Sequence, residues 1–240
     1  MSATTDRFRT PLYTVAEAAR YLGVPESTFH TWARGRSRKP EGRSEVHGAS
    51  LVTVIKGQPR GSASLPFVGL AEGLALTAIR KSGVTMRRIR PALEVLQKEL
   101  GMDHVLASES LYTDGSEILY DYAEQVGDSD EAHAARELVV VRHGQHVFND
   151  VMNHYLHGVE FASDGYAQVI PLPGFGLADV VADPRRGFGQ PTFERGGAKV
   201  EDVIGLFLAG ERLTDVSEEY GVPMSELEDA LRVAAARHAA

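Results

Sequence analysis

Apolar positions near the start of the chain recur at the spacing of an α-helix. Residues 15–22 carry them on one face, which favours an amphipathic helix. Thr14, followed three residues later by Glu17, forms a capping box that satisfies free backbone N–H groups at the start of this helix. Gly23 supplies the left-handed conformation that ends it. We expect the buried face to consist of Val15, Ala18, Ala19 and Leu22.

A second helix is predicted directly afterwards, because Pro25 suits a first turn, where backbone donors are unpaired anyway. Phe29 and Trp32 are expected to face the core. The outward positions are then Ser27, Thr28, His30, Thr31 and Arg34. Two short helices joined by a glycine-containing turn form a helix-turn-helix, whose second helix can enter the major groove of DNA. Many such pairs only pack, so other features must decide between the two roles.

Basic residues follow the candidate recognition helix. The segment RGRSRKPEGR, residues 34–43, carries Arg34, Arg36, Arg38, Lys39 and Arg43. Cations that neutralise phosphates release counterions, so such a cluster predicts salt-dependent binding to DNA, although a solvated basic loop is the alternative. Residues 50–57, SLVTVIKG, predict one strand of a β-wing, and Lys56 and Arg60 could reach a flanking phosphate. Together with Thr14, these residues form the candidate DNA-binding set.

Two further amphipathic helices are expected between residues 65 and 101, ending at Gly83 and Gly101. A helix-turn-helix, a wing and then helices resemble the DNA-binding domain of MerR-type winged-helix regulators, most specifically in TVAEAARYLGVPESTFHTW. This resemblance covers roughly the first 100 residues and implies a domain over residues 1–101. The chain differs from that family in lacking a long coiled coil, since RIRPALEVLQKEL is short and contains Pro91.

The tripeptide GVP of the first turn occurs again at residues 221–223, where it separates two helices of a second, C-terminal helix-turn-helix pattern. The apolar positions expected to face inward there are Val200, Val203, Ile204, Phe207, Leu213, Val216, Tyr220, Leu227, Leu231 and Ala234. The outward face of the last helix offers Glu226, Glu228 and Asp229. Carboxylates are repelled by phosphates, so we expect this copy to be a protein-binding or packing module.

Charge divides unevenly along the 240 residues, whose formal net charge is −8. Residues 1–100 hold 16 Lys and Arg against 8 Asp and Glu, whereas residues 101–240 hold 9 against 25. The division suggests a basic part for a polyanion and an acidic part with another task. There is no cysteine, apolar signal core or run long enough to span a bilayer, so a cytoplasmic protein without a membrane partner is expected.

The C-terminal segment GFGQPTFERGGAKVEDVIGLFLAGERLTDVSEEYGVP resembles a small winged-helix domain of unknown function found in bacterial antitoxin-like proteins. The whole chain is similar to long VapB-type antitoxins, which implies a VapC-type PIN-domain ribonuclease as partner and a promoter that the antitoxin itself represses. A PIN nuclease holds Mg²⁺ in a carboxylate cluster, so its inhibitor would present cations. Arg185, Arg186 and Arg195 are the candidate toxin-binding residues, with structural salt bridges as the alternative role.

The middle of the chain predicts β-structure. Asp114-Gly115 suits a type I′ turn within a hairpin over residues 110–122, and further strands are expected at 137–144 and 164–176. The fold class is therefore α+β and mainly helical: a winged helix-turn-helix domain (1–101), a β-containing middle region (102–182) and a C-terminal helix-turn-helix-like domain (183–240). The number of subunits is left open, a homo-oligomer being possible.

His146, Asp150 and His154 would share one face of a helix, as metal ligands require, but a solvated polar stripe beside an apolar face explains them as well. No Walker loop, G-x-S-x-G elbow or dinucleotide fingerprint occurs, which favours a binding protein without a cofactor over an enzyme. Two alternatives stay open. One is a one-component transcriptional regulator whose middle and C-terminal regions bind a small ligand or metal, and the other is a histidine-dependent metalloenzyme tethered to DNA.

Overall fold

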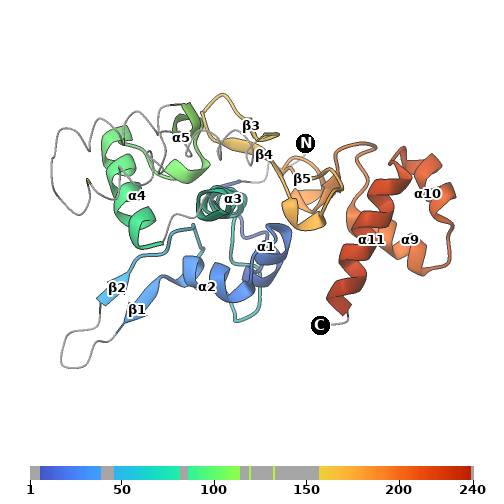
Figure 1. Cartoon of the computed structure of the whole chain (residues 1–240), viewed down its shortest axis with the longest axis horizontal. Helices are drawn as coiled ribbons and strands as arrows, with labels where there is room; N and C mark the ends of the chain where they lie inside the picture. The colour runs from blue at the N-terminus through green and yellow to red at the C-terminus, as the bar shows by residue number, and fades with distance from the viewer. Residues whose placement is uncertain are drawn as a thin grey trace, which may run out of the picture.

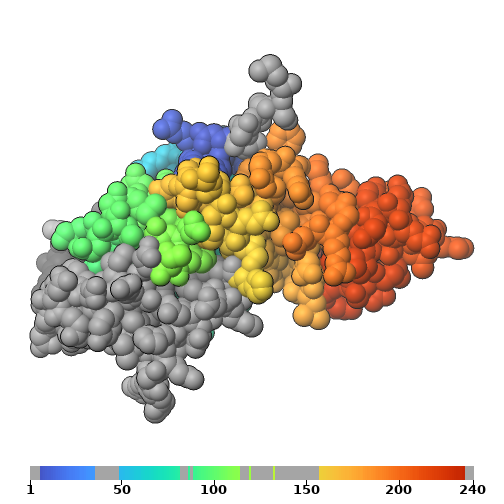
Figure 2. Space-filling model, turned by 90° about the horizontal axis from the view of Figure 1, so that it is seen from above, coloured from blue at the N-terminus to red at the C-terminus, as the bar shows by residue number. Residues whose placement is uncertain are grey.

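The computed structural model is elongated, with an N-terminal lobe, a small antiparallel sheet and a C-terminal group of three helices in sequence along its long axis (Figure 1). In the space-filling view the C-terminal helices form one end of the molecule (Figure 2). This mixture of helices with a small antiparallel sheet confirms the predicted α+β class. The structure describes residues 6–38, 46–81, 86–113, 119, 132 and 157–238.

The N-terminal helix-turn-helix consists of α1 (Val15–Tyr21) and α2 (Glu26–Arg34). The capping box is confirmed, because the Glu17 N–H donates to the Thr14 hydroxyl over 3.1 Å and the Glu17 carboxylate accepts from the Thr14 N–H over 2.8 Å. Gly23 has a φ of +66°, a left-handed conformation that favours glycine in this turn. The local pattern therefore determined both the start and the end of α1.

The wing is built from other residues than those expected. Strand β1 (Arg36–Arg38) pairs antiparallel with β2 (Val46–Gly48), directly after α2. The expected strand at 50–57 is wrong: this segment runs through bends and turns. Its backbone instead bonds to other elements, since the Leu51 N–H donates to the Trp32 carbonyl over 2.8 Å. The backbone of residues 50–57 therefore bonds to the core of the lobe and not to a neighbouring strand.

Helix α3 (Phe67–Lys81) lies at the centre of the N-terminal lobe, end-on in Figure 1. The predicted amphipathic pattern is wrong for this helix, because every residue from Phe67 to Ile79 is buried. Close packing requires small residues: a Cβ added at Gly73 would lie 2.6 Å from the Phe29 ring. Helix α4 (Met86–Leu100) is amphipathic as expected, with Ile89, Leu93 and Leu96 buried.

The predicted hairpin at 110–122 is also wrong over its first residues. These belong to α5 (Glu109–Thr113), which follows the 3-10 helix η1 (Val105–Ala107). The Ser108 hydroxyl accepts from the Leu111 N–H over 3.4 Å, so a serine at the start of α5 favours the helix. Residues 114–118, with the Asp114-Gly115 pair, and the strand expected at 137–144 lie outside the described residues.

A four-stranded antiparallel sheet connects the two ends of the molecule. Its order is β3 (Glu160–Phe161), β4 (Ala167–Pro171), β5 (Val180–Ala182) and β6 (Thr192–Phe193). The 3-10 helix η2 (Pro173–Phe175) lies between β4 and β5 and packs against α1. The strand expected within residues 164–176 corresponds to β4.

Three helices complete the chain: α9 (Val200–Leu208), α10 (Leu213–Tyr220) and α11 (Met224–His238). The turn between α10 and α11 contains the second GVP tripeptide, and Gly221 has a φ of +65°, like Gly23 in the first copy. Val203, Val216 and Leu227 are buried as the pattern predicts. Phe207 is not, since it is 40% exposed and Leu208 beside it is 72% exposed.

Candidate nucleic-acid interface and partner surfaces

The outward face of α2 is polar and accessible. Phe29 and Trp32 are buried, with ring centroids 5.7 Å apart, and they fix the helix on the lobe. The Thr31 hydroxyl donates to the Ser27 carbonyl over 2.9 Å. All five predicted outward positions of α2 are exposed or half-exposed and lie away from the core: Ser27, Thr28, His30, Thr31 and Arg34.

The predicted cations flank this face on two segments. Arg36 and Arg38 lie on β1, which begins two residues after α2 ends, while Lys39 lies outside the described residues. Lys56 and Arg60 are exposed in the turns after residue 55. Thr14, the remaining member of the predicted set, uses its hydroxyl to cap α1. Hydroxyl, arginine and lysine side chains are of the kind that contact phosphates.

Two hydrogen bonds fix the base of the wing. The Trp32 carbonyl at the end of α2 accepts from Leu51, as described above, and the Arg90 guanidinium on α4 donates to the Ala49 carbonyl over 2.7 Å. Since β2 ends at Gly48, both bonds act immediately beside the hairpin. The hairpin is therefore positioned by α2 and α4 together.

A buried carboxylate lies behind the wing. Glu72 on α3 accepts from the Thr53 hydroxyl over 3.0 Å, and its carboxylate lies 2.9 Å from Nδ1 of His104. This hydrogen bond to Glu72 raises the pKa of His104, against the opposing effect of its partial burial. His104 has a φ of +55°, which is unusual for a residue other than glycine. Sequence patterns missed this pair, because its members lie on separate elements.

A cavity of about 380 Å³ borders the pair. Its other polar lining residues are Ser50, Arg90, Glu94 and Gln97. It therefore lies between the residues that follow the wing, helix α4 and the segment around His104. A small polar molecule bound there would contact the same residues that position the hairpin.

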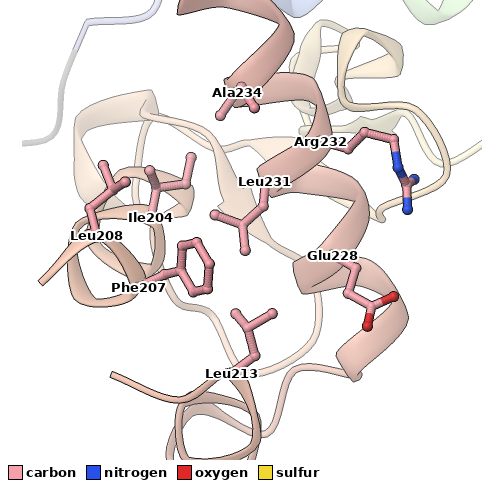
Figure 3. Close-up of a pocket in the computed structure, with 9 residues that line it drawn as sticks. Ile204, Phe207, Leu208, Leu213, Glu228, Leu231, Arg232 and Ala234 are labelled. Atoms are coloured by element: carbon pink, nitrogen blue, oxygen red, sulfur yellow. The ribbon is translucent and has the colours of Figure 1, made fainter. Parts of the chain in front are cut away.

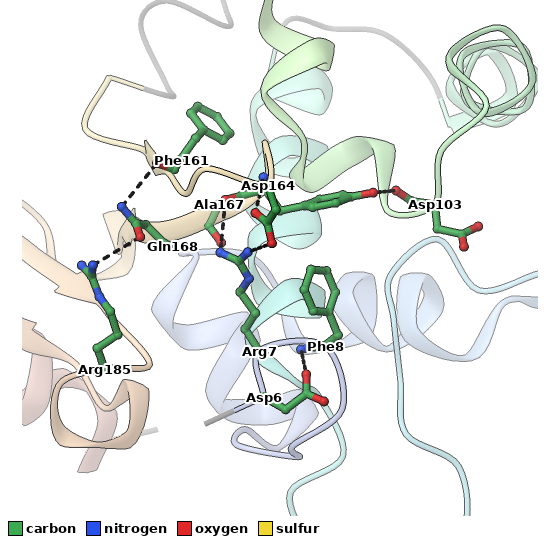
Figure 4. Close-up of polar contacts among 10 residues, drawn as sticks. Asp6, Arg7, Phe8, Asp103, Phe161, Asp164, Ala167, Gln168 and Arg185 are labelled. Carbon is green, nitrogen blue, oxygen red and sulfur yellow. Dashed lines mark hydrogen bonds and ion pairs between the residues drawn. The ribbon is translucent and has the colours of Figure 1, made fainter. Parts of the chain in front are cut away.

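The candidate toxin-binding arginines differ in their environments. Asp183 is buried and accepts from the Arg185 guanidinium over 2.9 Å, while Arg186 lies 3.6 Å from its other carboxylate oxygen. Arg185 also donates to the Gln168 side chain over 3.2 Å (Figure 4). Arg195 is exposed near a tight turn at Gly196 and Gly197. The first two arginines thus have a structural role through Asp183, and their guanidinium groups still reach solvent.

The outward acidic face predicted for the second helix-turn-helix is wrong for two of its three residues. Glu226 and Asp229 are buried, and only Glu228 is exposed. The Asp229 carboxylate accepts from the backbone N–H of Leu177 and, over 3.1 Å, from that of Ala178. The position of α11 that would read DNA is therefore packed against the loop after η2. Packing therefore adds to charge as a physical reason to expect different roles for the two copies.

Arginine also joins the N-terminal segment to the sheet. The Arg7 guanidinium donates to the carbonyls of Tyr166 and Ala167 over 3.3 and 3.2 Å and pairs with Asp164 (Figure 4). Nothing in the sequence around residue 7 indicated this role, because its partners are about 160 positions away.

The predicted metal ligands His146, Asp150 and His154 lie outside the described residues. Among the residues that the structure does describe, no group of three or more His, Asp or Glu side chains could hold a metal ion. No helix in this part of the chain is both long and apolar enough to cross a bilayer.

Comparisons with known proteins add a family to this geometry. Residues 11–93 match a family model described as "Putative DNA-binding HTH domain". The chain is 48% identical over 232 residues to the "Putative antitoxin VapB45" of Mycobacterium tuberculosis, which covers 96% of each chain. It is 23% identical over 226 residues to the "Uncharacterized protein Rv2308" of the same organism, covering 92% of this chain and 88% of that protein.

Among solved structures, the X-ray crystal structure of Rv2018 from Mycobacterium tuberculosis matches with a TM-score of 0.76 and 44% identity, covering 94% of this chain and 99% of that one. The matched model runs from the start of α1 to the middle of α4, which confirms the expected helix-turn-helix domain at the N-terminus. High identity over nearly the whole length extends the relationship to the sheet and the C-terminal helices. The chain therefore belongs to the family of the "Putative antitoxin VapB45".

Proposed function

We propose that this protein is a non-enzymatic DNA-binding antitoxin that represses its own promoter and neutralises a PIN-domain ribonuclease. The observation that carries the DNA-binding part is α2, whose polar side is accessible while Phe29 and Trp32 hold its other side in the core. The 48% identical relative named as an antitoxin supports the second part. The DNA-binding part would use the N-terminal lobe (Figure 1), whereas the candidate toxin-binding arginines follow β5 and β6 of the sheet.

In this proposal α2 enters the major groove and the hairpin β1–β2 lies along the adjacent backbone. The side chains assigned to base edges or nearby phosphates are Ser27, Thr28, His30, Thr31 and Arg34. Those assigned to flanking phosphates are Arg36, Arg38, Lys39, Lys56 and Arg60. Thr14 contributes by fixing the start of α1. Its hydroxyl accepts from the Glu17 N–H, and its own proton is assigned to a phosphate contact.

The DNA-binding part is tested with the full chain and a fluorescent duplex from the region upstream of its own gene. We expect fluorescence anisotropy to show binding at 50 mM salt that weakens steeply by 200 mM, and weaker binding to a scrambled duplex of equal length. Absence of binding at 50 mM salt would remove this part of the proposal.

The antitoxin part is tested by co-expression with a PIN-domain ribonuclease encoded in the same operon. Growth arrest by the ribonuclease should be relieved by the wild-type chain. For the contact itself we assign a role to Arg195, which is exposed, with Arg185 and Arg186 as further candidates. If alanine at all three positions leaves neutralisation unchanged, the contact lies elsewhere on the molecule.

A second candidate, a one-component regulator that senses a small polar ligand, is favoured by the cavity of about 380 Å³ beside Glu72 and His104. The two candidates differ in what changes DNA affinity. A regulator responds to a small molecule in the absence of any ribonuclease, whereas an antitoxin requires the protein partner.

A further inference from the structure

An apolar groove runs between α9 and α11, with Leu213 of α10 at one end (Figure 3). Its volume is about 410 Å³. Phe207 and Leu231 point toward one another across it, and Glu228 and Arg232 are its polar lining residues on α11 (Figure 3). The apolar lining consists chiefly of Ile204, Phe207, Leu208, Leu213, Leu231 and Ala234.

This groove continues an apolar stripe of α11 that is only partly covered: Leu227, Leu231 and Ala234 share one helical face, but only Leu227 is fully buried. Leu227 and Ala230 are fully buried, and Asp229 holds the same helix to the loop after η2. Leu231 and Ala234 line the groove beside α9 and are half-buried. Phe207 and Leu208 are left 40% and 72% exposed. Contiguous exposed apolar side chains of this kind mark sites of protein contact.

The shape of the groove favours a helix as occupant. Two helices form its walls, and an amphipathic helix placed between them would bury its apolar face as a third neighbour. Such a helix supplies its own backbone hydrogen bonds, which suits walls that offer few polar groups.

The charge around the groove determines which helix would bind. Exposed carboxylates on the three helices and on the turn between α9 and α10 are numerous: Glu201, Asp202, Glu211, Asp215, Glu218, Glu219 and Glu228. Among the side chains described between residues 200 and 235, the exposed arginines are Arg212 and Arg232, and Arg232 is paired with Asp229 at 2.8 Å. A second copy of this face would bring carboxylate against carboxylate. A helix that carries Lys or Arg beside its apolar stripe would instead be attracted.

We propose that the groove between α9 and α11 binds a basic amphipathic helix of the partner protein, which under the proposed antitoxin function is the ribonuclease. The apolar face of that helix would cover Phe207, Leu208 and Leu231, and its cations would face the acidic rim. This assigns the main protein-binding surface to the C-terminal helices, with Arg195 outside the groove.

The proposal is tested with the full chain and a fluorescein-labelled helical peptide of Leu and Lys with an i, i+3, i+4 apolar stripe. A peptide with Glu in place of Lys is the charge control. Fluorescence anisotropy should show binding of the Lys peptide at least about tenfold tighter than of the Glu peptide. Equal affinity for both peptides would overturn the proposal.

The decisive variant is Leu208→Glu, which makes the surface more acidic. Purely electrostatic attraction of the Lys peptide would then strengthen, whereas docking in the groove would weaken by about tenfold or more, because a charge would face the apolar stripe. The matched control is Leu177→Glu, which changes a leucine that is 90% exposed outside the groove. Circular dichroism confirms that both variants are folded. Unchanged or tighter binding by Leu208→Glu contradicts the proposal.

Neutralisation of the co-expressed ribonuclease separates this inference from the antitoxin function. If the wild-type chain and Leu208→Glu both neutralise the ribonuclease, the antitoxin function stands and the groove is not its binding site. If the wild-type chain does not neutralise it, the antitoxin function fails, and the peptide titration still decides whether the groove binds a basic helix. Loss of neutralisation only in Leu208→Glu supports both.

Discussion

The hydroxyl of Tyr13 donates a buried 2.8 Å hydrogen bond to the carbonyl of Gly189, 176 positions further along the chain. The bond joins the start of the helix-turn-helix to the 3-10 helix η3 (Gly187–Gly189), between the sheet strands β5 and β6. Burial raises the pKa of Tyr13 well above its usual range, so the hydroxyl keeps its proton and acts as a donor. The DNA-binding candidate surface and the sheet are therefore connected through a side chain with no exposed face.

Removing this bond should destabilise the protein. Tyr13→Phe leaves the Gly189 carbonyl without its buried donor, and we expect a loss of about 1–2 kcal/mol, or a fall in Tm of roughly 2–6 °C. Tyr166→Phe is the matched control, since its hydroxyl donates over 2.9 Å to the Asp103 carbonyl in a solvent-exposed position. Water can replace that bond, so Tyr166→Phe should lose less stability than Tyr13→Phe. Equal changes in both variants, measured by urea unfolding, would contradict this interpretation.

Two glycines provide an opposed pair of substitutions. A Cβ at Gly174 in η2 would overlap the backbone carbonyl oxygens of Arg20 and Tyr21 at the end of α1. Gly174→Ala should therefore cost about 1–3 kcal/mol or more, because the backbone must shift. Gly205 lies inside α9 with nothing within 4 Å of its added Cβ. Gly205→Ala should stabilise the chain by about 0.5–1 kcal/mol. The two changes in Tm should have opposite signs.

The Glu72–His104 pair should make stability depend on pH. Because the pKa of His104 is raised in the folded state, its contribution is fully present below the unfolded pKa of about 6.5 and is lost as pH rises through the folded pKa. We expect the destabilisation caused by Glu72→Gln, measured by urea unfolding, to be larger at pH 6 than at pH 8.5. His30→Gln, which alters a histidine on the outward side of α2, is the control. A Glu72→Gln effect that does not vary with pH would exclude this account.

Arg34 should contribute to DNA binding through its charge. It is exposed in the last turn of α2. Arg34→Ala should weaken binding of the promoter duplex by about tenfold and reduce the slope of log affinity against log salt by about one. Arg212→Ala removes an exposed arginine near α10, at the other end of the molecule, and should leave both quantities unchanged. The same salt slope for Arg34→Ala and the wild-type chain would remove Arg34 from the interface.

Two acidic neighbours on α11 should respond differently to loss of charge. Asp229→Asn weakens a buried acceptor of backbone N–H groups and breaks the ion pair with Arg232, so we expect a loss of about 1–3 kcal/mol. Glu228→Gln changes an exposed carboxylate and should stay within about 0.5 kcal/mol of the wild type. Chemical denaturation measures both. A loss below about 0.5 kcal/mol for Asp229→Asn would show that Asp229 does not hold α11 to its loop.

Features set by neighbouring residues could be predicted from the sequence. The capping box at Thr14, the left-handed Gly23 and the inward Phe29 and Trp32 all depend on spacing within a single helix or turn. The hairpin β1–β2 was missed because its strands, RSR and VHG, lack an alternating apolar pattern. Tertiary contacts outweighed β-propensity there, because Trp32 and Arg90 hold the base of the hairpin directly after α2.

Features set by distant partners could not be predicted in the same way. Asp229 lies on an outward helical position in the sequence pattern, yet its donors come from the loop about 50 residues earlier. Phe207 is apolar and correctly spaced for a core, yet it is 40% exposed beside the half-buried Leu231 and Ala234 of α11. The candidate interface on α2 was therefore predictable from local pattern, whereas the groove on α9 and α11 required the three-dimensional structure.

Helix α3 has no side that meets solvent between Phe67 and Ile79. It cannot fray or detach without uncovering side chains of α2 and the segment behind the wing, which it contacts through Gly73 and Glu72. The N-terminal lobe should consequently open as one cooperative unit, so that α2 does not melt independently of α3.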